Sequence, residues 1–280
     1  MPPVSTTTLT TPTGPVALPT IGFGTWQVPD DEVVPAVLAA LDAGYRHIDT
    51  AALYGNEAGV GRALAGSDVP RDDVFVTTKV WNSDQGFDET LRAFDASMGR
   101  LALDVLDLYL IHWPAPGNDR YVDTWRALGR LRDDGRVRAI GVCNFQAEHL
   151  QRLHDETGEW PSINQVELHP YLQQSPLRAF HAQRDIVTES WSPLASGKRV
   201  LDDPVIDEIA RAHGATPAQV VIAWHLALDL VVLPKSVTPS RIVENLAAAD
   251  LELTGDELAA IATLDRGFRT GPDPEEFNGA

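Results

Sequence analysis

GYRHIDTAALYGNE, residues 44–57, places Asp49 directly after the short β-type run 45–48 and Tyr54 in the loop that follows. Two further runs end in the same way, since residues 74–78 lead to Lys79 and residues 106–111 lead to His112. Four such groups, a phenol, an ammonium, a carboxylate and an imidazole, can together donate a proton to a carbonyl oxygen as this oxygen gains negative charge. If these four side chains meet in space, they form a catalytic site.

Around this stretch, short β-branched runs alternate with amphipathic stretches, which is typical of βαβ units and a parallel sheet. The expected strands are 20–23, 46–48, 74–78, 106–111, 138–142, 163–167, 186–189 and 231–233. The expected helices are 31–43, 56–64, 87–101, 121–133, 147–155, 176–183, 204–213 with 217–228, and 239–248. Eight such units predict an α/β fold, a (β/α)8 TIM barrel.

Turn and cap residues support these boundaries. Gly44, Gly135 and Gly214 stand where helices should end, and Thr216-Pro217 and Thr238-Pro239 combine an N-cap with proline at the first helical position. The alternating residues 9–18 around a Pro/Gly turn predict an N-terminal β-hairpin that covers the bottom of the barrel. An extra C-terminal helix is expected over 254–264, and the tail 265–280 is either ordered or mobile.

Length and composition favour one domain over residues 1–280, because 280 residues with 44% apolar content can bury one large core. A net charge of −18 disfavours nucleic acid or an anionic membrane as a partner. The single cysteine, Cys143, rules out an internal disulfide, residues 1–8 lack the pattern of a signal peptide, and no apolar stretch reaches membrane-spanning length. We therefore expect a cytoplasmic monomer that acts on a small molecule.

The four residues suit distinct roles in reducing a carbonyl group. Tyr54 can supply the proton, and a cation at Lys79 would lower the pKa of this phenol from its ordinary value of about 10. A buried Lys79 needs a counter-charge, for which Asp49 is the evident partner. His112, held neutral, would orient the carbonyl oxygen. Each residue alone has a structural alternative, such as a cap or a core histidine, but barrel strands present their catalytic residues together at one end.

A dinucleotide site of Rossmann type is not expected, because no Gly-x-Gly-x-x-Gly motif follows a strand. The segment 233–245 instead runs from the last strand into a helix, where the helix N-terminus attracts phosphate. Lys235 and Arg241 add charge and Ser236 and Thr238 add hydroxyl groups, which suits the 2′-phosphate of NADPH. In the alternative interpretation Thr238 is only an N-cap and Arg241 a solvated helix residue.

The polar and aromatic residues at the other strand ends complete this prediction. Trp191 could stack on the nicotinamide, and Asn144 and Gln165 could hydrogen-bond its carboxamide. Residues expected to wall an apolar substrate site, next to His112, are Trp26, Trp81 and Trp113. Tryptophan is also a common core residue, so a purely structural role is the alternative for each.

Three segments, GYRHIDTAALYGNE, LDLYLIHWP and LPKSVTPSRIVEN, resemble the signature segments of the aldo-keto reductase family, in the family's order and across nearly the whole chain. Within the family, the chain is most similar to the bacterial 2,5-diketo-gluconate reductase-like group. The resemblance implies an NADPH-dependent (β/α)8 reductase of aldehydes, ketones and dicarbonyls with Asp49, Tyr54, Lys79 and His112 as catalytic residues. The cofactor contacts assigned on this basis are Gly24, Thr25, Asp49, Asn144, Gln165, Trp191, Ser192, Leu194, Ser196, Lys235, Ser236, Val237, Thr238, Arg241, Glu244 and Asn245.

Two departures from the family pattern bear on cofactor binding. Cys143 stands where the family commonly has serine, so one carboxamide hydrogen bond should be weaker or lost. The loop 192–198 lacks the acidic residue that some members place over the pyrophosphate, which would allow faster cofactor release.

Two other functions compete with catalysis. The chain could be a non-catalytic NADPH-binding regulatory subunit that senses redox state, although the intact Tyr54 and Lys79 argue against this. A metal-dependent barrel hydrolase would need clustered His and carboxylate ligands at the strand ends, and the sequence offers no such set. We therefore expect no metal.

Overall fold

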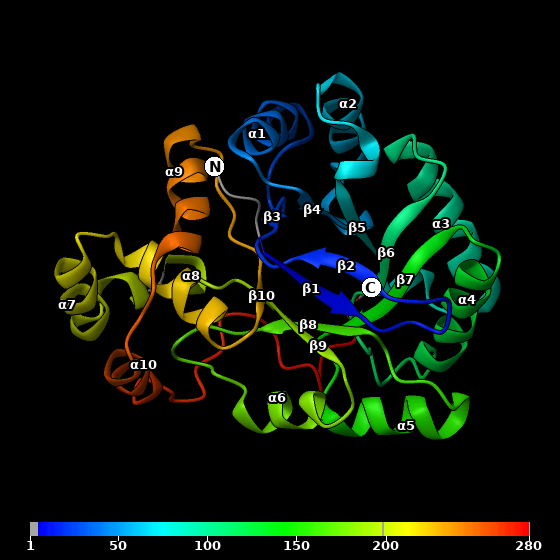
Figure 1. Ribbon diagram of the computed structural model, residues 1–280. Coiled ribbons are helices and arrows are strands. Elements are labelled where there is room, and N and C mark those ends of the chain that lie inside the picture. Colours follow the sequence, from blue (N-terminus) through cyan, green and yellow to red (C-terminus); the bar gives the residue numbers. More distant parts are fainter. Residues whose placement is uncertain (1–4, 198, 280) are drawn as a thin grey trace.

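The computed structural model describes residues 5–197 and 199–279. Its barrel strands are β3 (Phe23–Gly24), β4 (His47–Asp49), β5 (Phe75–Val80), β6 (Leu106–Ile111), β7 (Val137–Cys143), β8 (Ile163–Glu167), β9 (Val187–Trp191) and β10 (Val231–Val232). The strands pair in parallel in chain order, and a parallel bridge between Ile21 and Val232 closes the ring. The predicted (β/α)8 barrel is confirmed (Figure 1).

Helices surround this ring (Figure 1). They are α1 (Asp30–Ala43), α2 (Glu57–Gly66), α3 (Phe87–Leu101), α4 (Tyr121–Asp133), α5 (Ala147–Thr157), α6 (Ser175–Ala182), α7 (Pro204–His213), α8 (Pro217–Ala227), α9 (Pro239–Leu246) and α10 (Gly255–Ala262). Short 3-10 turns are η1 (Ala52–Tyr54), η2 (Arg71–Asp73), η3 (Asn82–Asp84), η4 (Ala195–Gly197), η5 (Val200–Asp202) and η6 (Ala247–Asp250). The expected extra C-terminal helix is α10. Gly44 and Gly214 end α1 and α7 in the left-handed conformation, as predicted.

The first strand differs most from its predicted span of 20–23. Its ladder begins only at Phe23, because Ile21 pairs on the other side, with Val232. Residues 20–24 therefore divide their hydrogen bonds between two neighbours and serve as the junction where the barrel closes.

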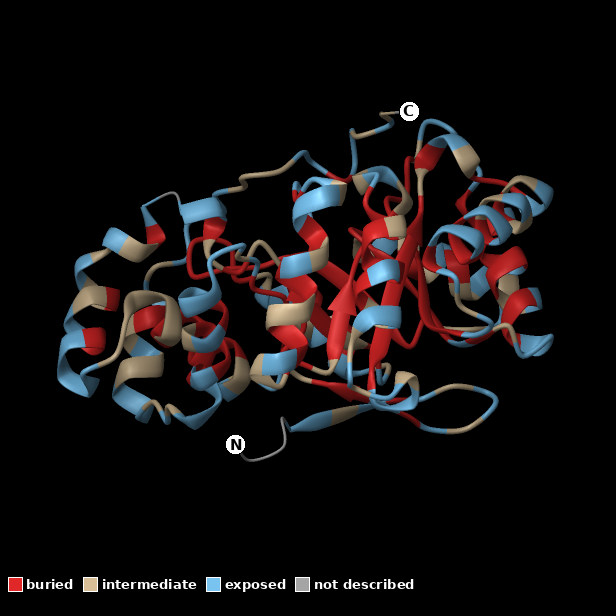
Figure 2. Cartoon of the chain, turned by 90° about the horizontal axis from the view of Figure 1, so that it is seen from above, coloured by how far each residue is buried: buried red, intermediate tan, exposed pale blue. Residues whose placement is uncertain are grey.

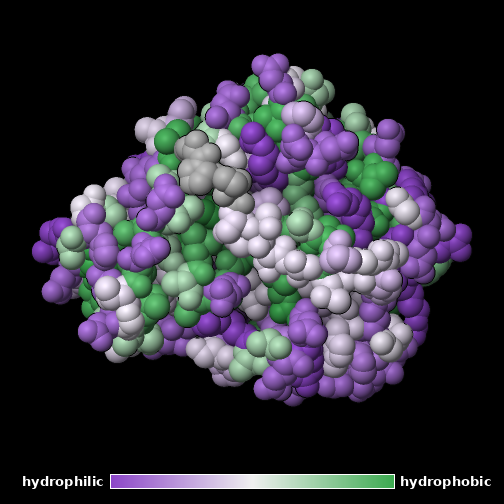
Figure 3. Space-filling model, viewed as in Figure 1, coloured by the Kyte–Doolittle hydropathy of each residue, from purple (hydrophilic) through white to green (hydrophobic). Residues whose placement is uncertain are grey.

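The N-terminal hairpin, β1 (Thr6–Leu9) with β2 (Val16–Pro19), covers one end of the barrel as predicted. Leu9 and Leu18 are fully buried, and they belong to the same apolar cluster as the barrel-lining Leu108 and Val231. Figure 1 shows the hairpin crossing in front of the strands, and Figure 3 shows the same face with hydrophilic residues spread around its rim. This end of the barrel is closed, so an active site must lie at the other.

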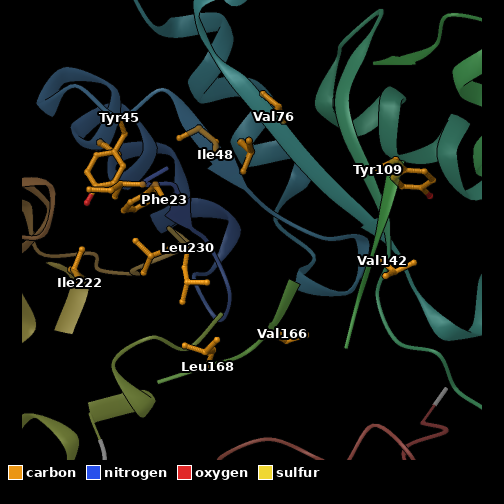
Figure 4. Close-up of a cluster of buried hydrophobic side chains, with 14 of the residues drawn as sticks. Phe23, Tyr45, Ile48, Val76, Tyr109, Val142, Val166, Leu168, Ile222 and Leu230 are labelled. Atoms are coloured by element: carbon orange, nitrogen blue, oxygen red, sulfur yellow. The ribbon is translucent and has the colours of Figure 1, made fainter. Parts of the chain in front are cut away.

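Side chains alternate along each barrel strand between the inside of the barrel and the surrounding helices. The outward residues pack with helix side chains in the larger apolar cluster, which includes Phe23, Val76 and Tyr109 from the strands and Tyr45 just before β4 (Figure 4). The rings of Phe23 and Tyr45 meet edge to face with centroids 5.7 Å apart. Figure 2 shows that the barrel strands are mostly buried, while the helices expose their outer faces.

The inward residues change in character along the barrel. Near the hairpin they are apolar, with Phe75, Leu108 and Ile163 in one cluster. Gly141 belongs to this inner set, and a Cβ there would lie 2.4 Å from the Ile163 side chain, so only glycine fits. Toward the carboxyl ends of the strands the inward positions become polar.

Candidate active site

Alternation along β4 and β5 brings two charged residues to one rim. On β5 the inward positions are Phe75, Thr77 and Lys79, and on β4 they are His47 and Asp49. Since these strands are parallel neighbours, Lys79 and Asp49 meet near the open end of the barrel. The period of two in the sequence therefore determines which side chains face each other.

Lys79 and Asp49 form a buried ion pair. The Lys79 ammonium lies 2.7 Å and 2.8 Å from the two Asp49 carboxylate oxygens and 2.9 Å from the Thr50 carbonyl oxygen. An ammonium carries three N–H groups, so these acceptors use all of them. Burial disfavours the charged form of Lys79, but the neighbouring groups, above all Asp49, together outweigh burial and raise the pKa of Lys79 above its ordinary value. Lys79 is therefore a fixed positive charge inside the barrel.

Tyr54 and His112 gather around this charge. The Lys79 nitrogen lies 5.2 Å from the centroid of the Tyr54 ring, and the Tyr54 and His112 rings meet edge to face at 5.7 Å. Tyr54 ends the short turn η1, which Asn56 holds by accepting a hydrogen bond from Thr50 and donating to the Thr25 carbonyl oxygen. The structure thus brings together all four residues predicted to be catalytic.

The protonation states of Tyr54 and His112 follow from burial. Burial raises the pKa of Tyr54 above its ordinary value, and the opposing charge of Lys79 reduces this shift without reversing it. Lys79 therefore lowers the pKa of the phenol as expected, but desolvation is the larger effect, so the pKa of Tyr54 is raised overall. Burial, aided by the charge of Lys79, holds the pKa of His112 well below its ordinary value, so the imidazole is neutral as expected.

A further carboxyl group, which the sequence prediction missed, lies deeper in the barrel. Glu189 is fully buried, and the Gln165 amide bridges it to the catalytic pair by donating 2.9 Å to Asp49 and 2.7 Å to Glu189. Burial, together with the negative charge of Asp49, raises the pKa of Glu189 to about 8. The alternation Val187, Glu189, Trp191 would have placed this carboxyl group inside the barrel.

Asn144 and Trp191 hold each other at the rim. The Trp191 indole N–H donates to Asn144 Oδ1 at 2.8 Å, and Asn144 Nδ2 donates to the His112 carbonyl oxygen at 3.0 Å. Asn144 also lies 3.1 Å from the sulfur of Cys143, and its φ of 66° is left-handed. The predicted nicotinamide contacts Asn144, Gln165 and Trp191 thus lie together, but Asn144 and the Gln165 amide nitrogen already have protein partners.

The predicted phosphate-binding segment is open and positively charged. Lys235 and Arg241 are exposed, and neither forms an ion pair within the residues that the structure describes. Thr238 occupies the N-cap position of α9, yet its side chain makes no capping hydrogen bond. At the equivalent start of α8, Thr216 does cap the helix by accepting from Gln219 N. The N-terminus of α9 is therefore left free to bind an anion.

Other residues assigned to the cofactor lie around the same rim. Gly24 ends β3 and Thr25 follows it, and the Thr25 hydroxyl donates to the Asp49 carbonyl oxygen at 3.0 Å. The hydroxyl groups of Ser192 and Ser196 are 3.3 Å apart in the loop after β9. In or near α9, Val237 is exposed, Asn245 is buried, and Glu244 accepts a hydrogen bond from Thr216 at 2.9 Å. Leu194 is partly buried against the core, and Lys198 of this loop lies outside the described residues.

Tryptophan side chains surround His112 at the opening. Trp81 lies with its centroid 5.1 Å from His112, while Trp113 is buried and meets Trp191 at 6.4 Å. Trp26, two residues after the end of β3, is 48% exposed, and no aromatic contact joins it to the other tryptophans within the described residues. The C-terminal tail adds Phe277, whose ring centroid is 4.6 Å from that of Trp113. Of the two possibilities left open for the tail, the structure shows an ordered segment as far as Gly279.

The donor set at this rim fits a nicotinamide dinucleotide better than a metal ion. The described residues contain no group of three or more His, Cys, Asp or Glu side chains placed to hold a metal. They do offer an aromatic ring, Trp191, a buried imidazole atom without a partner, His112 Nδ1, and the free end of α9 with two cations. Among the same residues, no helix combines the length and apolar character needed to span a membrane.

Comparisons with known proteins agree with this geometry. The pattern of the Aldo/keto reductase family matches residues 20–266. An aldo-keto reductase of Mycolicibacterium smegmatis is 57% identical over 262 residues, which cover 94% of this chain and 95% of that relative. The methylglyoxal reductase DkgA of Salmonella typhimurium is 54% identical over 263 residues, with 94% and 95% covered.

Solved structures give the same result. A crystal structure of a Gox0644 mutant in complex with NADPH has a TM-score of 0.92 and 48% sequence identity, covering 98% of this chain and 99% of that one. The family and the group that the three sequence segments resemble are both confirmed. The chain belongs to the aldo/keto reductase family, and it is an NADPH-dependent oxidoreductase that reduces carbonyl groups.

Proposed function

We propose that the chain reduces small aldehydes, ketones and dicarbonyls such as methylglyoxal, with Tyr54 as the proton donor. The observation that carries this proposal is the position of the Tyr54 phenol, beside neutral His112 and 5.2 Å from the buried Lys79 charge. Bound NADPH supplies the hydride to the carbonyl carbon. The residues of this chain must then orient the carbonyl group and provide the proton.

Tyr54 keeps its proton until the carbonyl oxygen gains negative charge. Its raised pKa means that the phenol is protonated at neutral pH before the reaction. As the O–H bond breaks, the new tyrosinate lies beside the Lys79 ammonium, whose charge stabilises it. Because Asp49 and Thr50 already hold the ammonium, it need not move during the reaction. The phenol then recovers a proton from solvent.

His112 orients the substrate without competing as an acid. A neutral imidazole can donate one hydrogen bond to the carbonyl oxygen, and its lowered pKa prevents it from carrying a second proton at neutral pH. Its contacts with the rings of Tyr54 and Trp81 limit how far it can turn. The aromatic side chains of Trp81 and Trp113 beside it would favour a small carbonyl compound, and the DkgA relative is named a methylglyoxal reductase, which supports including dicarbonyls.

For the cofactor, we propose that Trp191 stacks on the nicotinamide and that Gln165 Oε1 accepts from its carboxamide. The Gln165 amide nitrogen is engaged with Asp49 and Glu189, but its oxygen has only the weak Cys143 thiol donor at 3.7 Å among the described residues. Asn144 would have to exchange one of its present partners to contact the same group. Ser236, Thr238, Lys235, Arg241 and Asn245 would hold the adenosine 2′-phosphate end.

Steady-state kinetics with a substrate panel test this function. Purified protein with NADPH should turn over methylglyoxal and phenylglyoxal many times per active site, and more efficiently than a simple monoaldehyde of similar size. Oxidation of no more than one equivalent of NADPH would favour the regulatory-subunit alternative instead. Equal efficiency for mono- and dicarbonyl substrates would remove the proposed preference.

We further propose that residues 1–280 act as one domain, as a cytoplasmic monomer. The single cysteine, buried Cys143, is compatible with a reducing compartment, and the described residues fold around one barrel. Sedimentation at enzyme concentrations used in assays tests the oligomeric state, and a stable dimer would contradict it.

A further inference from the structure

Glu167 is a buried carboxylate at the rim of the barrel that the proposed reaction does not use. It is the last residue of β8 and is 1% exposed. Its Oε1 accepts hydrogen bonds from the Thr270 amide and the Thr270 hydroxyl, both at 2.6 Å, and from His169 Nε2 at 3.1 Å. Its Oε2 accepts from the Gly271 amide at 3.1 Å. Three of these four donors therefore come from the C-terminal tail, more than 100 residues away in the sequence.

These bonds place the tail directly against Trp191. A Cβ at Gly271 would lie 2.6 Å from Cη2 of the Trp191 ring, so the glycine backbone packs on the edge of the indole. The opposite side of the indole is held through its N–H, which donates to Asn144 at 2.8 Å. Trp191 thus stands between Asn144 and the tail, and Glu167 holds the tail in place.

The tail continues from this point across the open end of the barrel. Phe277 packs on Trp113 at 4.6 Å and on Trp81 at 6.3 Å, and the Asn82 side chain donates to the Gly279 carbonyl oxygen at 2.8 Å. Figure 2 shows the C-terminal segment on the side of the barrel opposite the N-terminal hairpin. The tail is therefore anchored at two places, one beside Trp191 and one beside the aromatic substrate walls.

The charge of Glu167 suits this anchoring role. Burial alone would raise its pKa, but the hydrogen bonds from His169, Thr270 and Gly271 outweigh burial and hold the pKa below its ordinary value. An ionised carboxylate accepts on both oxygens and forms stronger hydrogen bonds to N–H donors than a neutral group does. A glutamine in its place would keep the shape but turn one acceptor into a donor that faces other donors.

We propose that Glu167 is a positioning residue that docks Thr270 and Gly271 against Trp191 and so fixes the indole for nicotinamide binding. This inference rests on the proposed contact between Trp191 and the nicotinamide. The nicotinamide is common to NADPH and NADH, so disturbing Glu167 should weaken both cofactors equally. Loss of the phosphate contacts at Arg241 should instead weaken NADPH alone.

The main test is Glu167→Gln in the full-length protein, with the dissociation constants of NADPH and NADH measured by fluorescence titration. We expect both constants to rise about two- to tenfold, the range that corresponds to one ordinary hydrogen bond. Thr270→Val removes the hydroxyl but keeps the backbone N–H, so its effect should be smaller and in the same direction.

Glu257→Gln is a matched control. Glu257 also accepts from a threonine amide and hydroxyl, those of Thr254, and from a histidine, His213, but it caps α10 away from the site. This variant should leave both cofactor constants unchanged. If it raised them as much as Glu167→Gln does, the effect of Glu167 would be a general loss of stability and the inference would fail.

Testing Glu167→Gln in a second protein, the Trp191→Ala variant, distinguishes an effect that acts through Trp191 from a general loss of structure. In Trp191→Ala, Glu167→Gln should have little further effect on cofactor binding, because the residue through which it acts is gone. An equal loss with and without Trp191 overturns the inference. If Trp191→Ala itself binds both cofactors normally, the proposed nicotinamide contact is wrong as well, so the two failures are distinguishable. Should Glu167→Gln not fold, Gly271→Ala tests the same contact from the tail, and normal cofactor binding in that variant overturns the inference.

Discussion

Two positively charged sites lie on the same barrel rim and differ in almost every other respect. Lys79 is 0% exposed and its ammonium is surrounded by Asp49 and Thr50. Lys235 and Arg241 are exposed and have no carboxylate partner within the described part of the chain. Burial and pairing hold the Lys79 ammonium in one position, so its charge can act on the neighbouring Tyr54 phenol. An exposed and unpaired charge is available to a ligand that brings its own negative charge.

The positions of these residues in the fold explain the difference. Lys79 occupies an inward position of β5, where the barrel closes around it. Lys235 follows the short β10, and Arg241 lies in the first turns of α9, both outside the barrel wall. A positive charge thus assists proton transfer at Lys79, whereas at Lys235 and Arg241 it is available to bind an anionic ligand. Substitutions should therefore affect the two sites differently.

The largest expected effect concerns the acid beside the buried charge. Tyr54→Phe removes the proton donor, so turnover should fall by about 10² to 10⁴, with NADPH affinity little changed. The measurement is kcat and KM with methylglyoxal together with a cofactor titration. Tyr109→Phe is the control, because Tyr109 faces the helices and packs on Phe94. A Tyr54→Phe enzyme that retains half of the wild-type rate would exclude this residue as the acid.

The buried charge itself comes next. Lys79→Met leaves Asp49 buried without its cation, which should lower the free energy of unfolding by about 3–5 kcal/mol and reduce turnover. Lys235→Met, at the exposed site, should change the free energy of unfolding by no more than about 0.5 kcal/mol while weakening NADPH binding. Urea unfolding of both variants checks the contrast. Equal losses of unfolding free energy in Lys79→Met and Lys235→Met would show that burial does not make the stability contributions of the two lysines different.

A third prediction concerns the carboxyl group beneath the pair and its pH dependence. The pKa of Glu189 is about 8 in the folded protein against an ordinary value of 4.5, so unfolding releases a proton between these pH values. Stability should therefore fall as the pH rises from 4.5 to 8, with a slope of at most about 1.4 kcal/mol per pH unit from this group.

Glu189→Gln removes this contribution, so the variant should gain stability relative to wild type as the pH rises through that window. The comparison between the two proteins cancels the buried histidines whose partners do not include Glu189, such as His181, whose pKa burial lowers to about 3. Unfolding free energies measured at several pH values give the result. A difference between variant and wild type that stays constant with pH would contradict the raised pKa.

The smallest expected effect belongs to the exposed site. Arg241→Ala should weaken NADPH binding about tenfold and leave NADH binding unchanged, because only NADPH carries the 2′-phosphate. Added salt should reduce this difference, since exposed charges are screened. Arg211→Ala on α7, where Arg211 pairs with Asp207, is the control. Equal losses for both cofactors would mean that Arg241 supports the structure of α9 and does not bind phosphate.

Sequence reasoning was most successful where a rule depends on neighbouring residues. The spans of β6, β8, α3, α4 and α7 agree with their predicted ranges because long periodic segments and glycine or proline signals define them. It was least successful at β3, where hydrogen bonds are shared with β10. Thr238 and Pro239 do occupy the predicted N-cap and first helical positions, but unlike Thr216 the Thr238 side chain makes no capping hydrogen bond.

The amino-acid sequence by itself determined the barrel, the family, and the rim on which Asp49, Lys79 and His112 would lie, because strand alternation and parallel order are local and repetitive properties. Only the tertiary structure decided the hydrogen-bond partners, the burial and hence the pKa values of those residues. The bond from Gln165 to Asp49 spans 116 residues, and those from Thr270 to Glu167 span 103. The pKa of Tyr54 likewise depends on how completely the closed barrel removes water. Desolvation and long-range contacts are properties of the assembled fold, and no local pattern in the sequence reports them.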